Sequence, residues 1–389
     1  MIVLIDAFRL VCEKNTSGHV YVRELALSLV EQDSVSKVIL IVPIQPTELI
    51  KEYFKHTDGI EFFVQSVSFD PAASWWLHSR WIQIHVAKAV NRIAHNYEKC
   101  CKLCFIAPYH QTPIIMSNKI RKLAVIHDLC GLDAESGYKK FSRPYFRHVF
   151  NFFTAISFAD VLLPISDFTK KEMERYYPNS VSKLTAPAYN SVTTEHLSAE
   201  VVAATIAPLS LPLKYFVAFS AMGPRKGTDI SILAYQLYKQ RGGKHQLLLI
   251  GSAAANRYWK DFANSHNVDG ITWLTGISDL QRDAIYATAE GLLFPSRCEG
   301  FGYPIVEAMR QGCPVIAWKN SPAYEIIQGV QDLLPAIDVN DIAFALEQYD
   351  ATENTPRDKL SNELIEKSYR FAKSDLGSEF VNALAEPRN

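Results

Sequence analysis

The stretch "GLLFPSRCEGFGYPIVEAMRQGCPVIAW", residues 291–318, contains a strand, a turn, a helix and a second strand in sequence. The apolar run that opens it ends at Pro295, and a second apolar run, "CPVIAW", closes it. Between the runs, Pro304 suits a first helical turn and Gly312 suits a helix stop. Because strands that alternate with helices assemble into parallel sheets, we expect an α/β fold here.

The same alternation continues along all 389 residues. Segments such as "VYVRELALSLVEQ", residues 20–32, repeat apolar residues at helical spacing between the apolar runs. A chain of this length exceeds a single compact core, so we expect two domains. The expected strands are residues 1–6, 37–43, 60–65, 102–108, 122–128, 160–166, 214–220, 245–252, 271–276, 291–296 and 313–318.

The domain boundaries lie where the alternation stops and restarts. Residues 1–190 are expected to form one doubly wound, Rossmann-like domain, and residues 214–365 a second. Residues 191–213 lack a strong periodicity and are expected to be the linker. The amphipathic segment 366–389 is expected to pack back on the first domain. Two open sheets that face each other leave a deep cleft at the carboxyl ends of their strands, where ligands bind.

Composition restricts the class of partner. Hydrophobic residues make up 48% of the chain and charged residues 21%, which is typical of a globular protein. Forty basic and 41 acidic residues give a net charge of -1, so no global positive field favours nucleic acid. No apolar run reaches the roughly 20 residues that cross a bilayer. We interpret the opening "MIVLIDAF" as a strand and not a signal peptide.

Seven cysteines, an odd number at scattered positions, do not resemble a disulfide framework. Cys101 and Cys104 have the C-x-x-C spacing of zinc and redox sites, but no second pair lies at a matching spacing. Because they run into an apolar stretch, we interpret them as small apolar residues that lead into a buried strand. A reducing cytoplasm is the expected location.

A candidate anion site follows the expected strand 214–220. Gly223 and Gly227 bracket Arg225 and Lys226, and a helical pattern comes next. Amide groups at a helix start, the helix dipole and two cations together favour phosphate oxygens, so a pyrophosphate is one interpretation. Solvated loop charges are an equally weighted alternative. The expected helix N-cap is Thr228 or Asp229.

Two carboxylates flank the glycine-rich turn in the opening stretch. Glu299 lies on the turn and Glu307 about one turn inside the expected helix, while Gly300 and Gly302 can adopt positive φ. One carboxylate can bind vicinal ribose hydroxyls. A second can hold sugar hydroxyls or stabilise positive charge at an anomeric carbon. Ribose, diphosphate and hexose together describe a nucleotide-sugar, whereas a hydrolase would need the two carboxylates to face each other closely.

Four motifs carry a family resemblance. "FPSRCEGFGYPIVEAMRQGCPVIAW" resembles the signature of family 4 retaining glycosyltransferases, in which two glutamates frame a G-F-G-x-P turn. "MGPRKG" resembles the diphosphate-binding loop of that family, "VIHDL" its N-terminal-domain histidine, and "PISDFTKKEM" the junction before its linker. The resemblance implies the GT-B fold, two facing Rossmann-like domains.

The resemblance also implies roles for individual residues. Glu307 is expected to bind the donor ribose, and Arg225 and Lys226 the departing diphosphate. Glu299 is expected to hold the donor sugar together with backbone amides of the turn. His127 is expected near the anomeric centre, although the residues alone favour a core histidine before a capping Asp128. The remaining implied contacts are Gly18 and Gly223 to phosphate, Gly300, Phe301 and Gly302 to the donor, and Gly276 and Ile277 to the nucleobase.

The implied activity is transfer of a hexose from a UDP-sugar or GDP-sugar to a saccharide or lipid-linked saccharide, with retention of configuration. No D-x-D cluster suggests a divalent ion, so we expect neither a metal nor a separate cofactor. A nucleotide-sugar-binding protein without transferase activity, or an epimerase, is the alternative. A nicotinamide dehydrogenase is disfavoured because no G-x-G-x-x-G follows the first strand.

Two aromatic and basic segments raise the question of membrane contact. Residues 74–95 mix three tryptophans with basic residues, and residues 143–158 are rich in aromatic residues and arginine. Such helices can rest on the cytoplasmic face of an acidic membrane that carries a lipid-linked acceptor in polysaccharide synthesis. Core helices with snorkelling basic residues are an alternative of at least equal weight.

Overall fold

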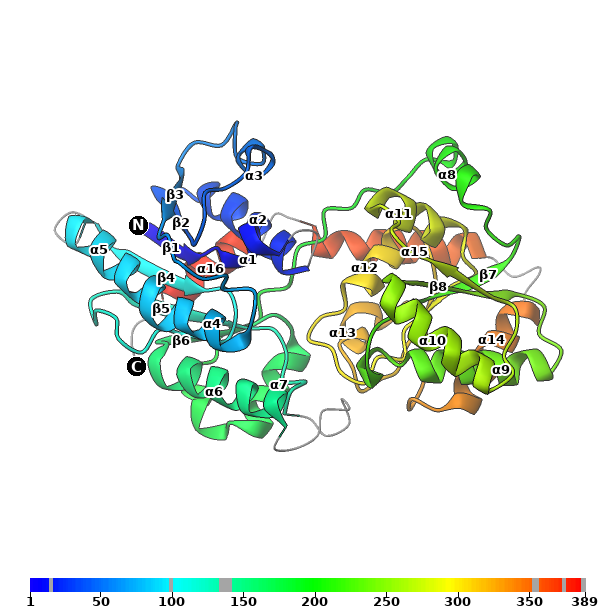
Figure 1. The fold of residues 1–389 in the computed structure, drawn as a ribbon. Helices are drawn as coiled ribbons and strands as arrows, with labels where there is room; N and C mark the ends of the chain where they lie inside the picture. The colour runs from blue at the N-terminus through cyan, green and yellow to red at the C-terminus, as the bar shows by residue number, and fades with distance from the viewer. Residues whose placement is uncertain (14–16, 98–100, 133–141, 352–356, 373–375, 386–389) are drawn as a thin grey trace. The chain divides into compact units, whose positions relative to one another are not determined.

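The chain divides into two compact units, each built around its own parallel sheet (Figure 1). The computed structural model describes residues 1–13, 17–97, 101–132, 142–351, 357–372 and 376–385. The first unit comprises Met1–Leu132, Lys139–Ser191 and Lys373–Asn389, and the second unit runs over Val192–Ala372. The α/β class with two parallel sheets, expected from the sequence, is therefore confirmed.

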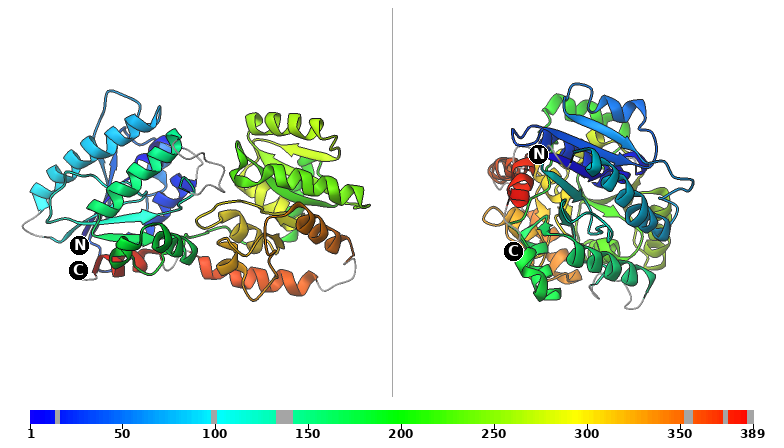
Figure 2. Two further views of the ribbon diagram at one scale, coloured as in Figure 1. Left: turned by 90° about the horizontal axis from the view of Figure 1, so that it is seen from below. Right: turned by 90° about the vertical axis from the view of Figure 1, so that its left-hand side faces the viewer.

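The first sheet has six parallel strands in the order β3-β2-β1-β4-β5-β6. Its central strands are buried on both faces because helices pack against each side, as the view from below shows (Figure 2). The chain moves outward from β1 to β3 and then returns to the other side of β1 as β4. The strands are β1 Ile2–Asp6, β2 Lys37–Val42, β3 Ile60–Val64, β4 Leu103–Ala107, β5 Arg121–Ile126 and β6 Val161–Pro164.

Helices cover this sheet. The two aromatic segments singled out in the sequence are helical: one is α4, a π-helical turn η1 and α5 in succession, and the other is α6. Ser166 caps α7 by accepting a hydrogen bond from the Thr169 amide at 3.0 Å. The helices are α1 Phe8–Cys12, α2 Ser17–Val30, α3 Glu48–Glu52, α4 Trp75–Arg80, η1 Trp81–Val86, α5 Ala87–Tyr97, α6 Arg143–Phe158, α7 Asp167–Tyr176, η2 Pro178–Lys183 and α16 Leu376–Ala385.

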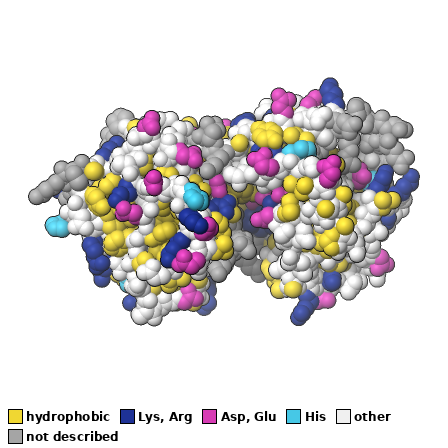
Figure 3. Space-filling model, turned by 90° about the horizontal axis from the view of Figure 1, so that it is seen from above, with side chains coloured by type: hydrophobic (Ala, Val, Ile, Leu, Met, Phe, Trp, Pro, Cys, Tyr) yellow, Lys and Arg dark blue, Asp and Glu magenta, His cyan; other side chains and the backbone are white. Residues whose placement is uncertain are grey.

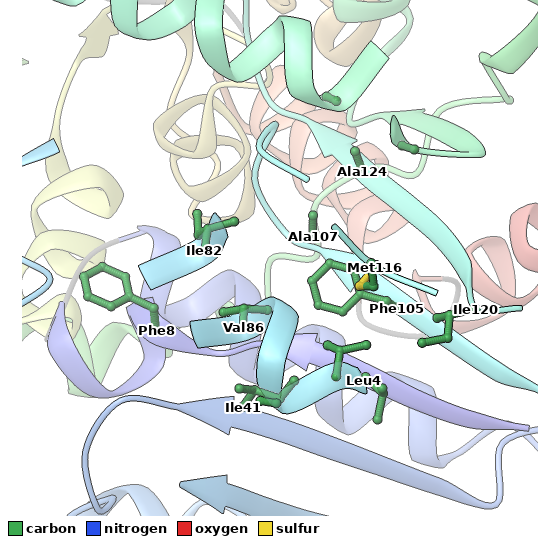
Figure 4. Packing of buried hydrophobic residues seen from close by; sticks show 14 of the residues in the cluster. Leu4, Phe8, Ile41, Ile82, Val86, Phe105, Ala107, Met116, Ile120 and Ala124 are labelled. Carbon is green, nitrogen blue, oxygen red and sulfur yellow. The ribbon is translucent and has the colours of Figure 1, made fainter. Parts of the chain in front are cut away.

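The core of the first unit joins the sheet to the π-helical turn (Figure 4). Leu4, Ile41 and Phe105 come from three neighbouring strands and pack with Ile82 and Val86 of η1. On the opposite side, the C-terminal helix α16 packs on α2. Burial of apolar side chains on both faces of the sheet therefore fixes the positions of the strands, and with them the polar side chains at the strand ends.

The C-x-x-C cysteines have different surroundings. Cys104 is buried in β4, whereas Cys101 is exposed before the strand, and both carry free thiols. Cys101 thus precedes β4, which begins at Leu103, and Cys104 lies within it, as expected for small residues that lead into a buried strand.

The second sheet has five parallel strands in the order β11-β10-β7-β8-β9. It repeats the topology of the first sheet, since the chain returns past β7 to place β10 on its other side. The strands are β7 Tyr215–Ser220, β8 Gln246–Gly251, β9 Ile271–Leu274, β10 Gly291–Leu293 and β11 Val315–Ile316. The helices are α8 Ala199–Ile206, η3 Ala207–Leu209, η4 Pro224–Lys226, α9 Thr228–Gln240, α10 Ala253–Ser265, α11 Asp279–Thr288, α12 Tyr303–Arg310, α13 Ala323–Ile327, α14 Val339–Ala351, α15 Arg357–Ser368 and η5 Tyr369–Phe371.

The segment expected to be the linker holds ordered structure. Ser198 caps α8, which packs against α11 in the second unit. The Val192 amide donates to the Phe371 carbonyl oxygen at 2.8 Å, which joins the two ends of this unit. Apolar residues on one face of α8 explain this packing, since Val202 is buried.

Acidic and basic side chains are interspersed over both units on the face shown in Figure 3, as the near-zero net charge implies. None of the described helices is both long enough and apolar enough to cross a bilayer.

Candidate functional site

The strand order of the second sheet brings two loops together. In a doubly wound sheet, the loops at the carboxyl ends of the strands on either side of the topological switch diverge and leave a crevice. Here those loops follow β7 and β10. The Arg297 amide donates to the Arg225 carbonyl oxygen at 2.8 Å, and Ser296 Oγ lies 3.1 Å from the same oxygen. Both candidate motifs therefore lie at one edge of one sheet.

Gly227 is the point of closest approach between these loops. Its φ of 67° is in the left-handed region, and a Cβ added there would lie 2.1 Å from the Pro295 carbonyl oxygen. Only glycine satisfies both conditions. Gly223, with φ 83°, allows the chain to turn before the two cations, and no other group lies within 4 Å of its Cβ direction.

The predicted N-cap of α9 was wrong. The N-cap position is Gly227, and no side chain makes a capping hydrogen bond there. Thr228 Oγ1 instead donates to the Phe219 carbonyl oxygen at 3.1 Å, which ties the helix to β7. Asp229 forms a bidentate ion pair with Arg297, at 2.7 and 2.9 Å, which joins the two loops. These side chains are used for tertiary contacts, so the first amides of α9 have no side-chain cap.

Arg225 and Lys226 converge on Glu299. Lys226 Nζ lies 2.5 Å and Arg225 Nη1 3.1 Å from Glu299 Oε1, and Ser296 Oγ donates to the same oxygen at 2.6 Å. The alternative that these cations are solvated loop charges is therefore wrong. Burial alone acts to raise the pKa of Glu299, but Lys226, Arg225 and the hydrogen bonds outweigh it, so its pKa is lowered. Glu299 is ionised at neutral pH.

Glu307 has a different environment. It lies inside α12, which begins after Gly302 (φ 96°) and has Pro304 in its first turn, as the sequence predicts. Arg282 Nε of α11 lies 3.3 Å from Glu307 Oε2. Burial raises the pKa of Glu307 to about 7. Arg282 opposes this rise, whereas the negative charges of Asp283 and Asp279 add to it. At neutral pH this carboxyl group is close to its point of half-ionisation.

The other predicted donor contacts lie nearby in the same unit. Gly276 has φ 66° and is exposed, and the half-buried Ile277 leads to Ser278, the N-cap of α11. Gly300 and Phe301 belong to the loop between β10 and α12. The Phe301 side chain is buried, with its ring edge-on to that of Phe371, so only its backbone faces the turn.

In the first unit, His127 follows β5 at the carboxyl edge of the sheet. Its Nε2 lies 2.7 Å from the Pro108 carbonyl oxygen, and its ring stacks on Tyr109 with centroids 4.6 Å apart. Since a carbonyl only accepts, Nε2 carries the proton and Nδ1 is an acceptor. Burial lowers the pKa of His127 to about 4, although the hydrogen bond and Asp128 oppose this. The imidazole is neutral at neutral pH.

Gly18 lies at the start of α2, where two side chains pack on its backbone. A Cβ there would lie 2.5 Å from Tyr109 Oη and 2.7 Å from Arg9 Cδ. The guanidinium of Arg9 lies over the Tyr109 ring, 3.8 Å from its centroid. This packing is a structural reason for glycine that does not depend on phosphate. Asp128 Oδ1 accepts a hydrogen bond from the Cys130 amide at 3.0 Å.

Part of the second unit matches a known family of enzymes. The family model described as glycosyl transferases group 1 matches residues 208–370. Residues 208–370 are a group 1 glycosyltransferase domain. This domain contains both loops of the candidate site, together with α11 and α12.

Curated relatives of the glycosyltransferase domain are named as mannosyltransferases, and one of them is named for the O-antigen chain. The serotype-specific mannosyltransferase WbdA of Escherichia coli is 30% identical over 138 residues, which cover 34% of this chain and 17% of WbdA. The O-antigen chain mannosyltransferase B of Escherichia coli is 29% identical over 185 residues, 43% of this chain and 46% of that protein. The chain thus spans less than half the length of these relatives.

Solved structures resemble the whole chain. Sucrose-phosphate synthase from Thermosynechococcus elongatus has a TM-score of 0.73 at 16% identity and covers 98% of each chain. Anabaena HepE in complex with UDP-glucose has a TM-score of 0.71 at 15% identity and covers 99% of each chain. At this identity the likeness shows the fold, which is the two-domain GT-B class.

Several residues of the site received no role from the sequence. Ser296 completes the Glu299 cluster, and Arg282 contacts Glu307. The segment "SDLQRDAIYAT" offered one signal for Arg282, an arginine between two aspartates on a capped helix, but nothing in it points to a carboxylate on α12. In the first unit, Asp6 and Tyr109 were also missed.

Proposed function

We propose that the chain is a metal-independent, retaining glycosyltransferase of family 4 that moves a hexose from a UDP-sugar or GDP-sugar to a hydroxyl acceptor. The observation that supports it best is the cluster of Arg225, Lys226 and Glu299 beside the uncapped start of α9. Two cations and helix amides that no side chain caps suit a diphosphate. The names of the curated relatives support an acceptor in cell-surface polysaccharide synthesis.

In the proposed reaction, the bond between the anomeric carbon and the diphosphate oxygen breaks while a bond to the acceptor oxygen forms. Negative charge develops on the departing diphosphate, where Arg225, Lys226 and the α9 amides stabilise it. Lys226 uses one of its three N–H groups on Glu299, so it keeps donors for phosphate. The acceptor proton passes to the leaving phosphate, so neither glutamate acts as a nucleophile and no divalent ion is needed.

Donor recognition in this proposal uses the two carboxylates differently. Glu299, ionised and held by three donors, accepts hydrogen bonds from hexose hydroxyls together with amides of Gly300 to Gly302. Glu307 accepts from the ribose hydroxyls, and the exposed turn at Gly276 and Ile277 borders the base. A carboxylate that accepts from two vicinal hydroxyls is an established way to hold ribose.

A product assay tests this function. The full chain is incubated with UDP-sugars and GDP-sugars and with saccharide acceptors, with and without a chelator. We expect nucleoside diphosphate and glycosylated acceptor in equal amounts, an anomeric coupling constant that shows retention, and no effect of chelation. Donor binding without any glycosylated product, or epimerised donor as the product, would overturn the transferase proposal.

We also propose that the first unit contacts an anionic membrane surface through α4, α5 and α6. The α6 residues Phe146, Val149 and Phe153 form an exposed apolar stripe, and Trp76 of α4 is 73% exposed. The two helices are neighbours, since the Trp75 ring packs edge-on to Phe150. Exposed basic residues flank these apolar residues, which is the pattern of an interfacial surface. They are Arg80, Lys88, Arg92 and Arg143.

Flotation with vesicles of phosphatidylglycerol and phosphatidylethanolamine tests this contact. We expect the native chain to float with the vesicles, and the double variant Phe146→Ser, Phe153→Ser to stay in the dense fraction. Phe344→Ser removes a similarly exposed phenylalanine from α14 in the second unit and serves as the control. Equal flotation of the double variant and the native chain would contradict the proposed surface.

A further inference from the structure

The geometry of α11 and α12 carries an inference about how Glu307 is held. Arg282 of α11 reaches across to α12, with Nε 3.3 Å from Glu307 Oε2. The same guanidinium pairs with Asp279 at 2.8 Å and with Asp283 at 3.0 Å. Its side chain is only 19% exposed. Arg282 therefore has little freedom, and its orientation is set by three carboxylates.

The start of α11 fixes this arrangement further. Ser278 and Gln281 form a reciprocal capping box, with hydrogen bonds of 3.1 and 2.9 Å. Such a box removes fraying from the first turn, which contains Asp279 and leads to Arg282. The guanidinium is thus positioned by a rigid helix end and not by a loop.

The ion pair engages only one oxygen of Glu307. Oε2 faces Arg282, whereas Oε1 has no hydrogen-bond partner among the residues that the structure describes. Because Oε1 has no such partner and yet is not a fully buried atom, it remains accessible to a ligand. A carboxylate held by one oxygen presents the other in a fixed direction.

We propose that Arg282 is a positioning residue that holds Oε2 of Glu307 and so aims the carboxylate at the ribose hydroxyls of the donor. This inference rests on the proposed nucleotide-sugar chemistry and deepens it. Once protonated, a carboxyl group has a donor in place of an acceptor site and no longer accepts equally from two hydroxyls. Arg282 does not contact the substrate itself.

The charges around Glu307 give this role its strength. Burial and the carboxylates Asp283 and Asp279 favour the protonated form, while Arg282 and the more distant Lys226 favour the ionised form. Tyr286, one turn after Arg282 on α11, has a buried Oη without a hydrogen-bond partner in the described structure and adds no positive charge. Without Arg282, burial and the two aspartates act on Glu307 with little opposition, so its protonation extends to higher pH.

Titration calorimetry of the full chain with UDP, GDP and their 2'-deoxy forms, between pH 6 and 9, tests the proposal. We expect the affinity of the native chain for whichever nucleotide it binds to rise with pH through about 7. Arg282→Met should weaken binding about tenfold at pH 7 and move the midpoint upward by about one pH unit. It should also reduce the preference for the ribonucleotide, whereas Arg282→Lys should restore part of each effect.

Tyr286→Phe is the matched control, because it changes the same helix face without changing charge. Absence of nucleotide binding by the native chain at every pH would count against the proposed function itself. Native binding combined with an unchanged midpoint and ribose preference in Arg282→Met would overturn the positioning role. An equal loss at all pH values that Arg282→Lys does not restore would indicate a structural role and would overturn it as well.

Discussion

The carboxyl edges of the two sheets share a topology and differ in chemistry. In the second unit, Arg225, Lys226 and Glu299 are charged groups in direct contact. In the first unit, His127 is half-buried and neutral, and burial raises the pKa of Asp6 to about 6 in spite of hydrogen bonds from Trp81 and Phe8. One edge holds compensated charge, and the other holds polar groups that burial drives toward neutrality.

The difference shows that the sheet supplies positions and the loops supply chemistry. Both sheets place their first and fourth strands side by side, which brings the loops after these strands together. In the second unit those loops contain cations and glycines, which suits a diphosphate. In the first unit the loop after β4 contains the Tyr109 ring, and His127, which follows the neighbouring strand β5, adds an imidazole acceptor. These groups suit a neutral hydroxyl group.

The largest expected effect comes from removing the charge of the second edge. The double variant Arg225→Ala, Lys226→Ala should reduce turnover by about 100- to 1,000-fold, because in the proposed reaction these two cations stabilise the charge that develops on the leaving group. Steady-state release of nucleoside diphosphate measures this effect.

The control for this variant is Arg257→Ala, Lys260→Ala, which removes two exposed cations from α10 in the same unit. Native turnover in the site variant would show that the cations serve only to neutralise the buried Glu299. Adding Glu299→Gln to the site variant separates stability from catalysis: it should restore thermal stability, since no buried charge then lacks a partner, but not turnover.

A smaller effect is expected for the second carboxylate of the same edge. Glu307→Gln should weaken binding of the nucleotide about 10- to 100-fold, the cost of replacing charge-assisted hydrogen bonds to hydroxyl groups. Calorimetry at pH 8, where the native carboxyl group is ionised, measures the difference. Glu363→Gln on α15 is the control, and equal affinity of Glu307→Gln and the native chain would remove Glu307 from the site.

The first edge gives a stability effect with the opposite pH dependence from an ordinary ion pair. Because the pKa of Asp6 is raised from 3.8 to about 6 in the folded chain, its contribution to stability is greatest below pH 4 and is lost as the pH rises through 6. Asp6→Asn should therefore match the native chain at pH 4 and exceed it by on the order of 1–2 kcal/mol at pH 7.5. Thermal melts measure the difference, with the exposed Asp33→Asn as control; a loss of stability at pH 7.5 would contradict the prediction.

The contrast between the edges was only partly predictable from sequence. Short apolar runs predicted the positions of the buried strands. The stretch "RCEGFGYPIVE" predicted the turn with Glu299 and Gly302 and the helix with Glu307, since glycine and proline have strong local conformational preferences. Contacts between distant segments were not predictable. The Asp229 ion pair with Arg297 displaced the expected N-cap because the strand order brings residues 68 positions apart into contact.

The same limit applies to residues that act through burial. Nothing in "IVLIDAF" distinguishes Asp6 from a capping aspartate, because its pKa is raised by burial under segments that lie far along the chain. Its hydrogen-bond partner Trp81, which opposes that rise, comes 75 residues later. Likewise, α8 lies in the segment that the sequence predicts to be the linker, because a short helix with one buried face has too few residues to show a clear helical repeat of apolar residues.

The smallest expected effect tests the neutral character of the first edge. His127→Gln should lower turnover about five- to tenfold and leave nucleotide affinity unchanged, because in the role that the family resemblance implies, near the anomeric centre, one hydrogen bond to Nδ1 is lost. Since the pKa of His127 is about 4, the native and variant pH profiles of kcat should have the same shape between pH 5.5 and 8. His95→Gln, an exposed histidine of α5, is the control. A step near pH 6.5 that disappears only in His127→Gln would mean that this imidazole titrates in the working range, and the distinction between a charged edge and a neutral edge would then fail.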